Sequence, residues 1–179
     1  HLRVIPGVEI STDVPHGEVH ILGYFIDYRD PELQRILKRF RNSRRERAQK
    51  IIAKLAALGI HIEWERVQEL AGDASIGRPH IAQAMLERGF ISSLKEAFIK
   101  YIGREGPAYA EREKMTPLES AELVKRMGGL PVLAHPRDID NLEGLLGQLK
   151  RGGLVGMEAY YNSYSPDVVE HLVAVASKH

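Results

Sequence analysis

The stretch RVIPGVEISTDVPHGEVHILGYF, from Arg3 to Phe25, indicates both the fold and a candidate site. It contains two short apolar runs, 4–10 and 19–25, joined by a loop rich in turn-forming residues. Such runs are typical of β-strands. Each run also carries one residue that an apolar strand does not need, which is Glu9 in the first run and His20 in the second. Both residues are potential metal ligands.

A hairpin would bring these two polar residues together. If its centre lies between Val14 and Pro15, Glu9 and His20 fall directly opposite one another, because cross-strand partners in one register keep a constant index sum. A carboxylate and an imidazole would then share one face of the sheet. The structural alternative is that Glu9 pairs with an arginine and His20 is a hydrogen-bonded core histidine, since ionised side chains are buried only when partnered.

A third polar residue closes a separate apolar strand. In the segment GLPVLAHP, the predicted strand 131–134 ends on His135, and Pro136 follows. In α/β sheets, chemistry collects at the carboxyl ends of the strands. His135 is therefore a third candidate ligand.

The composition is that of an ordinary globular protein. Of the 179 residues, 44% are hydrophobic and 27% are charged, and the net charge of +1 indicates no particular partner. No apolar run approaches the roughly 20 residues of a membrane span, so we expect no membrane partner and a cytoplasmic location. The chain has no cysteine, so a metal would have to be bound by His, Asp and Glu. Such ligands favour manganese, iron or zinc.

The order of predicted elements indicates an α/β protein with a helical insertion. Asp30 and Pro31 form a helix start, and the helical spacing that follows continues to Gly59. Further helical segments follow, up to the capping box of Thr116 and Glu119. Strands and helices then alternate, with a second strand predicted at 154–160, which implies parallel pairing.

Two features of the helical part could contact phosphate. Arg78 and His80 stand at the start of a predicted helix, where free backbone N–H groups favour an anion, although capping and packing would explain them equally. The long helix also carries a basic patch, which could face phosphates or could simply be solvated. This patch consists of Arg39, Arg41, Arg44, Arg45, Arg47 and Lys50.

Four short motifs occur in order along the chain: GVEIS at 7–11, HILGY at 20–24, GRPH at 77–80 and LAHP at 133–136. With the helical stretch between them, they strongly resemble the PHP-domain metal-dependent phosphoesterases, over nearly the whole chain. The closest resemblance is to the branch that removes the 3′-phosphate from nucleoside 3′,5′-bisphosphates and trims short RNA from 5′ to 3′. It implies an α/β fold that is a portion of a distorted (β/α)7 PHP barrel, with a helical insertion roofing the site.

The resemblance also implies roles for single residues. Glu9 matches the bridging carboxylate of the family, and His20 and His135 match two of its imidazole ligands. Glu9 and His135 are therefore the expected catalytic residues. Arg78 and His80 match a segment that the family places near the substrate phosphate, so we expect them to bind substrate. The implied cofactors are two or three divalent metal ions in the full-length site, with manganese expected first and iron or zinc as alternatives.

The motifs also predict how the chain is divided. We expect 1–29 and 116–179 to be parts of the PHP barrel and 30–115 to be the helical insertion. The family's opening His-x-His pair and closing Asp-x-His motif are absent from this sequence. We therefore expect the chain to be the central portion of a longer enzyme. On its own, this segment should bind metal weakly and catalyse poorly.

Two other functions remain open at this point. The basic patch could bind RNA or a protein, with the α/β part as a scaffold. Alternatively, the same fold could hydrolyse another phosphomonoester, such as histidinol phosphate. The expected substrate is a phosphate ester of a nucleotide or short RNA, and the sequence leaves the oligomeric state open.

Overall fold

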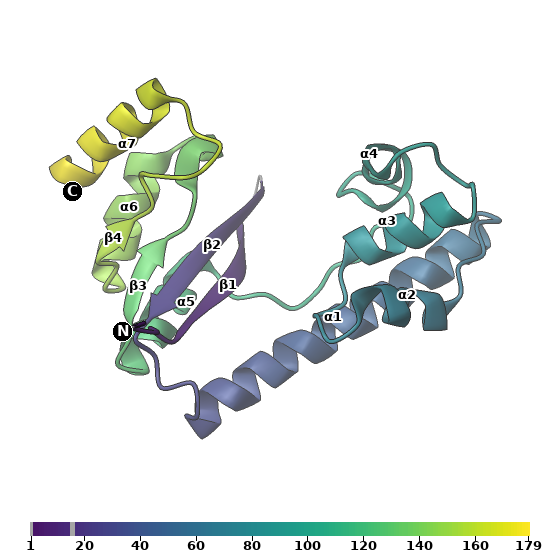
Figure 1. Ribbon diagram of the computed structural model, residues 1–179, viewed down its shortest axis with the longest axis horizontal. Helices are drawn as coiled ribbons and strands as arrows, with labels where there is room; N and C mark the ends of the chain where they lie inside the picture. Colours follow the sequence, from purple (N-terminus) through teal and green to yellow (C-terminus); the bar gives the residue numbers. More distant parts are fainter. Residues whose placement is uncertain (1, 15–16) are drawn as a thin grey trace. The chain divides into compact units, whose positions relative to one another are not determined.

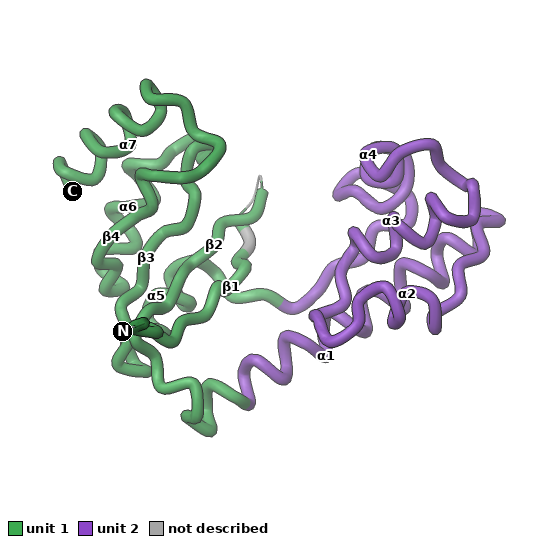
Figure 2. Tube along the Cα trace, in the orientation of Figure 1, with its two compact units in different colours: residues 1–34, 114–179 green, residues 35–113 purple. Residues whose placement is uncertain are grey.

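The computed structural model describes residues 2–14 and 17–179, apart from the side chain of Asp13 (Figure 1). The chain divides into two compact units, which Figure 2 shows in different colours. The first unit comprises His1–Gln34 and Lys114–His179 and contains the sheet. The second unit comprises Arg35–Glu113, and its described secondary structure is helical.

The first unit is built on a four-stranded mixed sheet with the order β1-β2-β3-β4. The strands are β1 (Gly7–Val14), β2 (Gly17–Tyr24), β3 (Leu130–Leu133) and β4 (Gly156–Met157). β2 pairs antiparallel with both β1 and β3, while β3 and β4 pair in parallel. The predicted α/β class is confirmed, and so is parallel pairing for the last two strands.

The register of the hairpin differs from the prediction by two residues. Glu9 lies opposite Leu22, and His20 lies opposite Ser11. The described pairs run from Gly7 with Tyr24 to Val14 with Gly17. The predicted centre of the hairpin involves Pro15, which is outside the described residues. The prediction that Glu9 and His20 are directly opposite is therefore wrong. Their common face survives, because side chains repeat every two residues along a strand.

Each strand of the hairpin has one buried face and one accessible face. Ile10 and Thr12 in β1, and Val19 and Ile21 in β2, are buried. The core of the first unit includes Ile21, together with side chains from other elements of the unit: Ala121, Leu133, Leu146, Leu149 and Val175. Glu9 and His20 point away from this core because they occupy the alternate positions. The chain before β1 is more exposed than a fully buried strand, since Val4 is 78% exposed.

Four helical segments complete the first unit: α5 (Pro117–Arg126), the short 3-10 helix η2 (Pro136–Asp138), α6 (Leu142–Arg151) and α7 (Pro166–Lys178). The predicted capping box is confirmed, because Thr116 and Glu119 bond reciprocally at the start of α5. β4 is shorter than the predicted strand 154–160. Within the described residues it pairs only with β3, over two residues.

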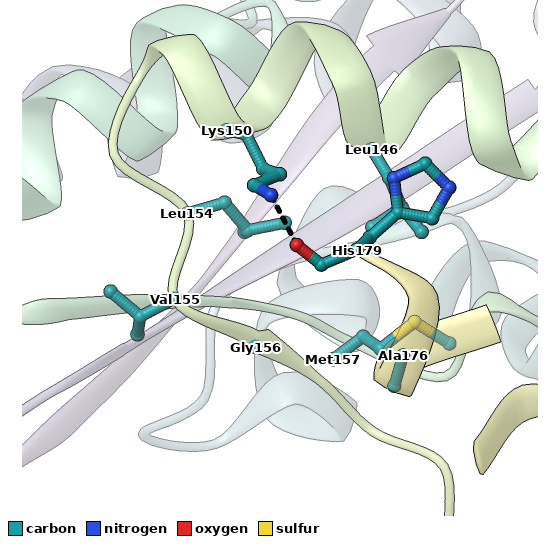
Figure 3. Close-up of a pocket in the computed structure, with 8 residues that line it drawn as sticks. All are labelled: Leu146, Lys150, Leu154, Val155, Gly156, Met157, Ala176 and His179. Carbon is teal, nitrogen blue, oxygen red and sulfur yellow. Dashed lines mark hydrogen bonds between the residues drawn. The ribbon is translucent and has the colours of Figure 1, made fainter. Parts of the chain in front are cut away.

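A small pocket lies between α6, β4 and α7 (Figure 3). Apolar side chains, including Leu146, Met157 and Ala176, form much of its lining. Lys150 donates a hydrogen bond through Nζ to the carbonyl oxygen of His179 at its rim. This pocket does not include Glu9, His20 or His135.

The second unit is a bundle of short helices against the long helix α1 (Pro31–Ala57), which begins in the first unit. Asp30 caps α1 as predicted, because its Oδ1 accepts from the backbone N–H groups of Glu32 and Leu33 at 2.8 and 2.9 Å. The other helices are α2 (Trp64–Ala71), α3 (Arg78–Glu87), α4 (Leu94–Ala97) and the π-helix η1 (Phe98–Ile102). A separate apolar core holds them together. In the described part of the chain, no helix combines the length and the apolarity needed to cross a membrane.

Candidate metal centre

Glu9, His20 and His135 come together on the accessible face of the sheet. Nδ1 of His20 lies 2.6 Å from Oε1 of Glu9 and 3.0 Å from Nε2 of His135. The third side of this triangle, from Nε2 of His135 to Oε1 of Glu9, measures 3.5 Å. The side chains are only partly buried, with exposed fractions of 49% for Glu9, 24% for His20 and 34% for His135. A carboxylate and two imidazoles therefore converge on one point that solvent can reach.

Backbone pairing in the sheet places His135 beside His20. The N–H of Ala134 donates to the carbonyl oxygen of His20 at 2.9 Å, which continues the β2–β3 ladder by one residue. His135 then leaves the strand with φ 29° and ψ 60°, a left-handed conformation that is uncommon for a residue with a side chain. The sharp turn at the strand end therefore directs this imidazole to the cluster.

The carboxylate of Glu158 holds that turn in place. Its Oε2 accepts a hydrogen bond from the backbone N–H of His135 at 2.9 Å, while the N–H of Glu158 donates to the carbonyl oxygen of Leu133, also at 2.9 Å. These two bonds bracket Ala134 and tie the end of β3 to the end of β4. Glu158 is not among the residues predicted from the sequence. Its signal was a carboxylate inside the predicted apolar strand 154–160, the same signal that singled out Glu9.

A second carboxylate stands on the other side of the His20 ring. Oε2 of Glu18 lies 3.9 Å from Nε2 of His20, and Oε1 of Glu18 forms a 3.1 Å ion pair with Nζ of Lys114. The Lys114 side chain is only 6% exposed. Glu18 and then Glu9 hold the pKa of His20 above its ordinary value, although burial acts in the opposite direction. His20 is therefore oriented by carboxylates near both ring nitrogens.

The donor atoms of the cluster fit a divalent cation. Ligands bound at about 2.1 Å in tetrahedral geometry are separated from one another by roughly 3.4 Å. The observed separation of 3.5 Å between Glu9 and His135 agrees with this value, whereas those of 3.0 and 2.6 Å are shorter, and the shortest is a direct hydrogen bond between Glu9 and His20 that a bound cation would replace. Two imidazole nitrogens and one carboxylate oxygen, without sulfur, form a donor set that suits manganese, iron or zinc.

Arg78 and His80 lie in the second unit and have contacts there. Arg78 donates through Nη1 to the carbonyl oxygen of Ile102 at 3.4 Å, and its guanidinium lies 5.5 Å from the ring centre of Phe98. Nδ1 of His80 accepts a hydrogen bond from the backbone N–H of Gly77 at 3.1 Å, which caps α3. The capping and packing alternative is therefore observed for both residues, and their role in substrate binding stays a prediction.

The basic patch is partly engaged within the second unit. Nε of Arg39 lies 3.1 Å from a carboxylate oxygen of Glu113, and the Arg45 guanidinium lies 5.3 Å from the ring centre of Trp64. Arg47 is buried, and its Nε donates to the carbonyl oxygen of Ala110 at 2.7 Å. These arginines stabilise the helical unit itself, so the patch is not simply a solvated face.

Comparison with known proteins shows what the chain as a whole is similar to. No protein-family model matches the chain. Over 99% of its length, the chain is 32% identical to the 5′-3′ exoribonuclease Rnm of Escherichia coli strain K12, and it covers 62% of that protein. It is also 29% identical, over 97% of its length, to the 3′,5′-nucleoside bisphosphate phosphatase of Chromobacterium violaceum, of which it likewise covers 62%. The chain thus spans about three fifths of the length of these relatives.

A solved structure agrees with these relatives. A protein of Bifidobacterium adolescentis, assigned as a metal-dependent phosphoesterase, matches 98% of this chain with a TM-score of 0.82 and 26% identity, and the match covers 64% of that protein. In fold and in sequence, this chain is similar to proteins of one class, the metal-dependent phosphoesterases. Within that class, the chain is a relative of the PHP-family phosphoesterases, so the resemblance found in the four sequence motifs is confirmed.

Proposed function

We propose that the complete protein is a metal-dependent phosphoesterase that hydrolyses phosphate esters of nucleotides. The substrates proposed are the 3′-phosphate of nucleoside 3′,5′-bisphosphates and short 5′-phosphorylated RNA. The observation that supports this most directly is the convergence of Glu9, His20 and His135, whose donor atoms all lie within 4.8 Å of one another. The names of the two relatives supply the substrate class.

Each residue of the cluster has a role in this proposal. His20 would bind through Nδ1 and His135 through Nε2, because these are the atoms that face Glu9. Glu9, as a carboxylate with two oxygens, would bridge neighbouring cations. Divalent ions bound here would polarise the phosphoryl oxygens and provide hydroxide at neutral pH. Three donors leave coordination positions for substrate and water, and the two or three ions predicted would need further ligands from elsewhere in the protein.

The remaining parts of the proposal concern the fold and the substrate. We propose that the sheet unit is part of a PHP barrel, with 1–29 and 116–179 as its segments and 30–115 as an insertion. Arg78 and His80 are proposed to contact the substrate phosphate. Arg78→Lys provides a first test of this role, because lysine keeps the charge but loses the planar fork that binds phosphate in two places. We expect a higher KM for the bisphosphate, with kcat much less affected.

The central test is hydrolysis of a nucleoside 3′,5′-bisphosphate by the complete gene product with manganese. Glu9→Gln and His135→Ala should each lower kcat/KM by roughly a hundredfold or more, because each removes a ligand. His171→Ala is the matched control, since His171 is an exposed histidine of α7 in the same unit. Unchanged turnover in both cluster variants would refute the proposal. Preferential hydrolysis of histidinol phosphate would support the metal-dependent phosphoesterase activity but contradict the proposed nucleotide substrate.

Binding of RNA by the basic patch is the alternative function. The charge reversals Arg41→Glu and Lys50→Glu, at two exposed positions of α1, separate the two functions. Phosphate contacts make affinity fall steeply with salt. RNA binding that persists in Glu9→Gln and disappears in the reversal variant would favour the binding module. If Glu9→Gln loses turnover while the reversal variant keeps it, the result favours the enzyme.

A further inference from the structure

A series of aromatic ring contacts begins at the Glu9–His20–His135 cluster. The His20 and His135 rings meet edge to face, with their centres 4.8 Å apart and an angle of 82° between them. The Tyr161 ring follows at 5.7 Å from His135, and the Tyr164 ring at 5.3 Å from Tyr161. All four residues belong to the first unit. The Tyr161 ring thus contacts His135, a proposed metal ligand.

Tyr161 remains accessible although it takes part in these contacts. Its exposed fraction is 47%, whereas Tyr164 behind it is half-buried. Tyr164 is also held by Arg137, because the Arg137 guanidinium lies 5.6 Å from its ring centre and the backbone N–H of Arg137 donates to its hydroxyl at 3.4 Å. An exposed tyrosine alone is common on protein surfaces. Tyr161 differs from such a residue, because its accessible ring is held by Tyr164 and lies beside a candidate metal ligand. Folding alone explains this arrangement less easily.

The chemistry of this surface suits a nucleobase. Planar bases stack on aromatic side chains, and the interaction tolerates any sequence because every base has a π-face. Single-stranded RNA is commonly recognised in this way, with unstacked bases placed against tyrosine or phenylalanine. We propose that Tyr161, supported by Tyr164, is a stacking platform for the base of the nucleotide whose phosphate ester lies at the Glu9–His20–His135 cluster. This inference rests on the proposed function, for which it specifies the base subsite.

The platform has a consequence for specificity. Stacking on one ring selects ligands with a base over ligands without one, but it distinguishes weakly between the four bases. A sugar phosphate should therefore be a poorer ligand than a nucleotide with the same phosphate groups. Adenosine and uridine bisphosphates should differ much less from each other than either does from a base-free analogue.

The experiment compares two ligands in the complete gene product. One is adenosine 3′,5′-bisphosphate, and the other is the same bisphosphate with hydrogen in place of the base. Tyr161→Leu removes the ring and should raise KM, and the dissociation constant measured by calorimetry, by about tenfold for the nucleotide. The values for the base-free analogue should change less than about twofold. Tyr161→Phe keeps the ring and should retain nucleotide affinity.

Tyr160→Leu is the matched control, because Tyr160 is the neighbouring tyrosine and is 77% exposed. Equal weakening of both ligands by Tyr161→Leu, or no weakening of either, would overturn the platform even if hydrolysis is normal. If the wild-type protein hydrolyses neither ligand, the proposed function fails. Calorimetry still decides the platform in that case: nucleotide-selective loss of binding in Tyr161→Leu supports it, and any other result overturns it.

Discussion

Nδ1 of His20 lies 2.6 Å from Oε1 of Glu9, although the two residues are not partners across the hairpin. They are diagonal neighbours, because His20 pairs with Ser11 while Glu9 is two positions earlier on the same strand. Such neighbours are within reach of long side chains. The other ring nitrogen of His20 faces Glu18, which leaves the imidazole between two carboxylates.

The two carboxylates make a prediction about pH. The pKa of His20 is raised above 6.5, chiefly by Glu18, with burial opposing and Glu9 adding to the rise. A cation must displace the proton of His20, so metal affinity should increase as pH rises through this elevated pKa and then level off. Glu18→Gln should shift this increase in metal affinity to lower pH, because it removes the largest cause of the raised His20 pKa. Manganese titrations by calorimetry across neutral pH measure this, and an unshifted profile in Glu18→Gln would contradict it.

Glu158 should influence metal binding without touching the metal. Glu158→Ala removes the acceptor that holds the N–H of His135 in its left-handed turn, so manganese affinity should fall by roughly 10- to 100-fold. The manganese affinity of Glu158→Gln, which keeps an acceptor oxygen, should fall less. Glu170→Ala in α7 is the control, because it removes an exposed carboxylate from the same unit. Equal affinities for Glu158→Ala and Glu170→Ala would show that the contact is incidental.

Close packing behind the sheet gives a prediction about stability. A Cβ on Gly129 would lie 2.7 Å from Cγ2 of Ile26 and 2.9 Å from the carbonyl oxygen of Tyr24. Gly129→Ala should therefore lower the free energy of unfolding by about 1–3 kcal/mol. Gly147→Ala in α6 meets nothing within 4 Å and should raise it by about 0.5–1 kcal/mol. Urea unfolding measures both, and a stable Gly129→Ala variant would mean that this contact relaxes easily.

The helix starts could be predicted from the sequence because their contacts are local. The side chain of Asp30 reaches the second and third residues after it, and Thr116 bonds with Glu119 three residues later. Both patterns can be read within one turn of chain. The places of Glu9 and His20 on strands, and of His135 just after the end of one, were also predictable, since each residue interrupts or ends an apolar run.

Other features depend on contacts that are distant in sequence. The register of the hairpin is set by how β1 and β2 meet, and a shift of two residues leaves the pattern of apolar and polar faces unchanged. Sequence patterning therefore predicts which face Glu9 occupies but not which residue it opposes. The bond from Glu158 to His135 joins residues 23 positions apart and exists only because β3 and β4 are adjacent.

The most direct test of the account is the position of a bound cation. Crystals of the complete gene product grown with manganese should show an anomalous difference peak within coordination distance of Oε1 of Glu9, Nδ1 of His20 and Nε2 of His135. The peak should disappear in Glu9→Gln crystals grown in the same way. Manganese bound elsewhere, with these three side chains keeping their direct hydrogen bonds, would contradict the assignment of this cluster as a metal centre.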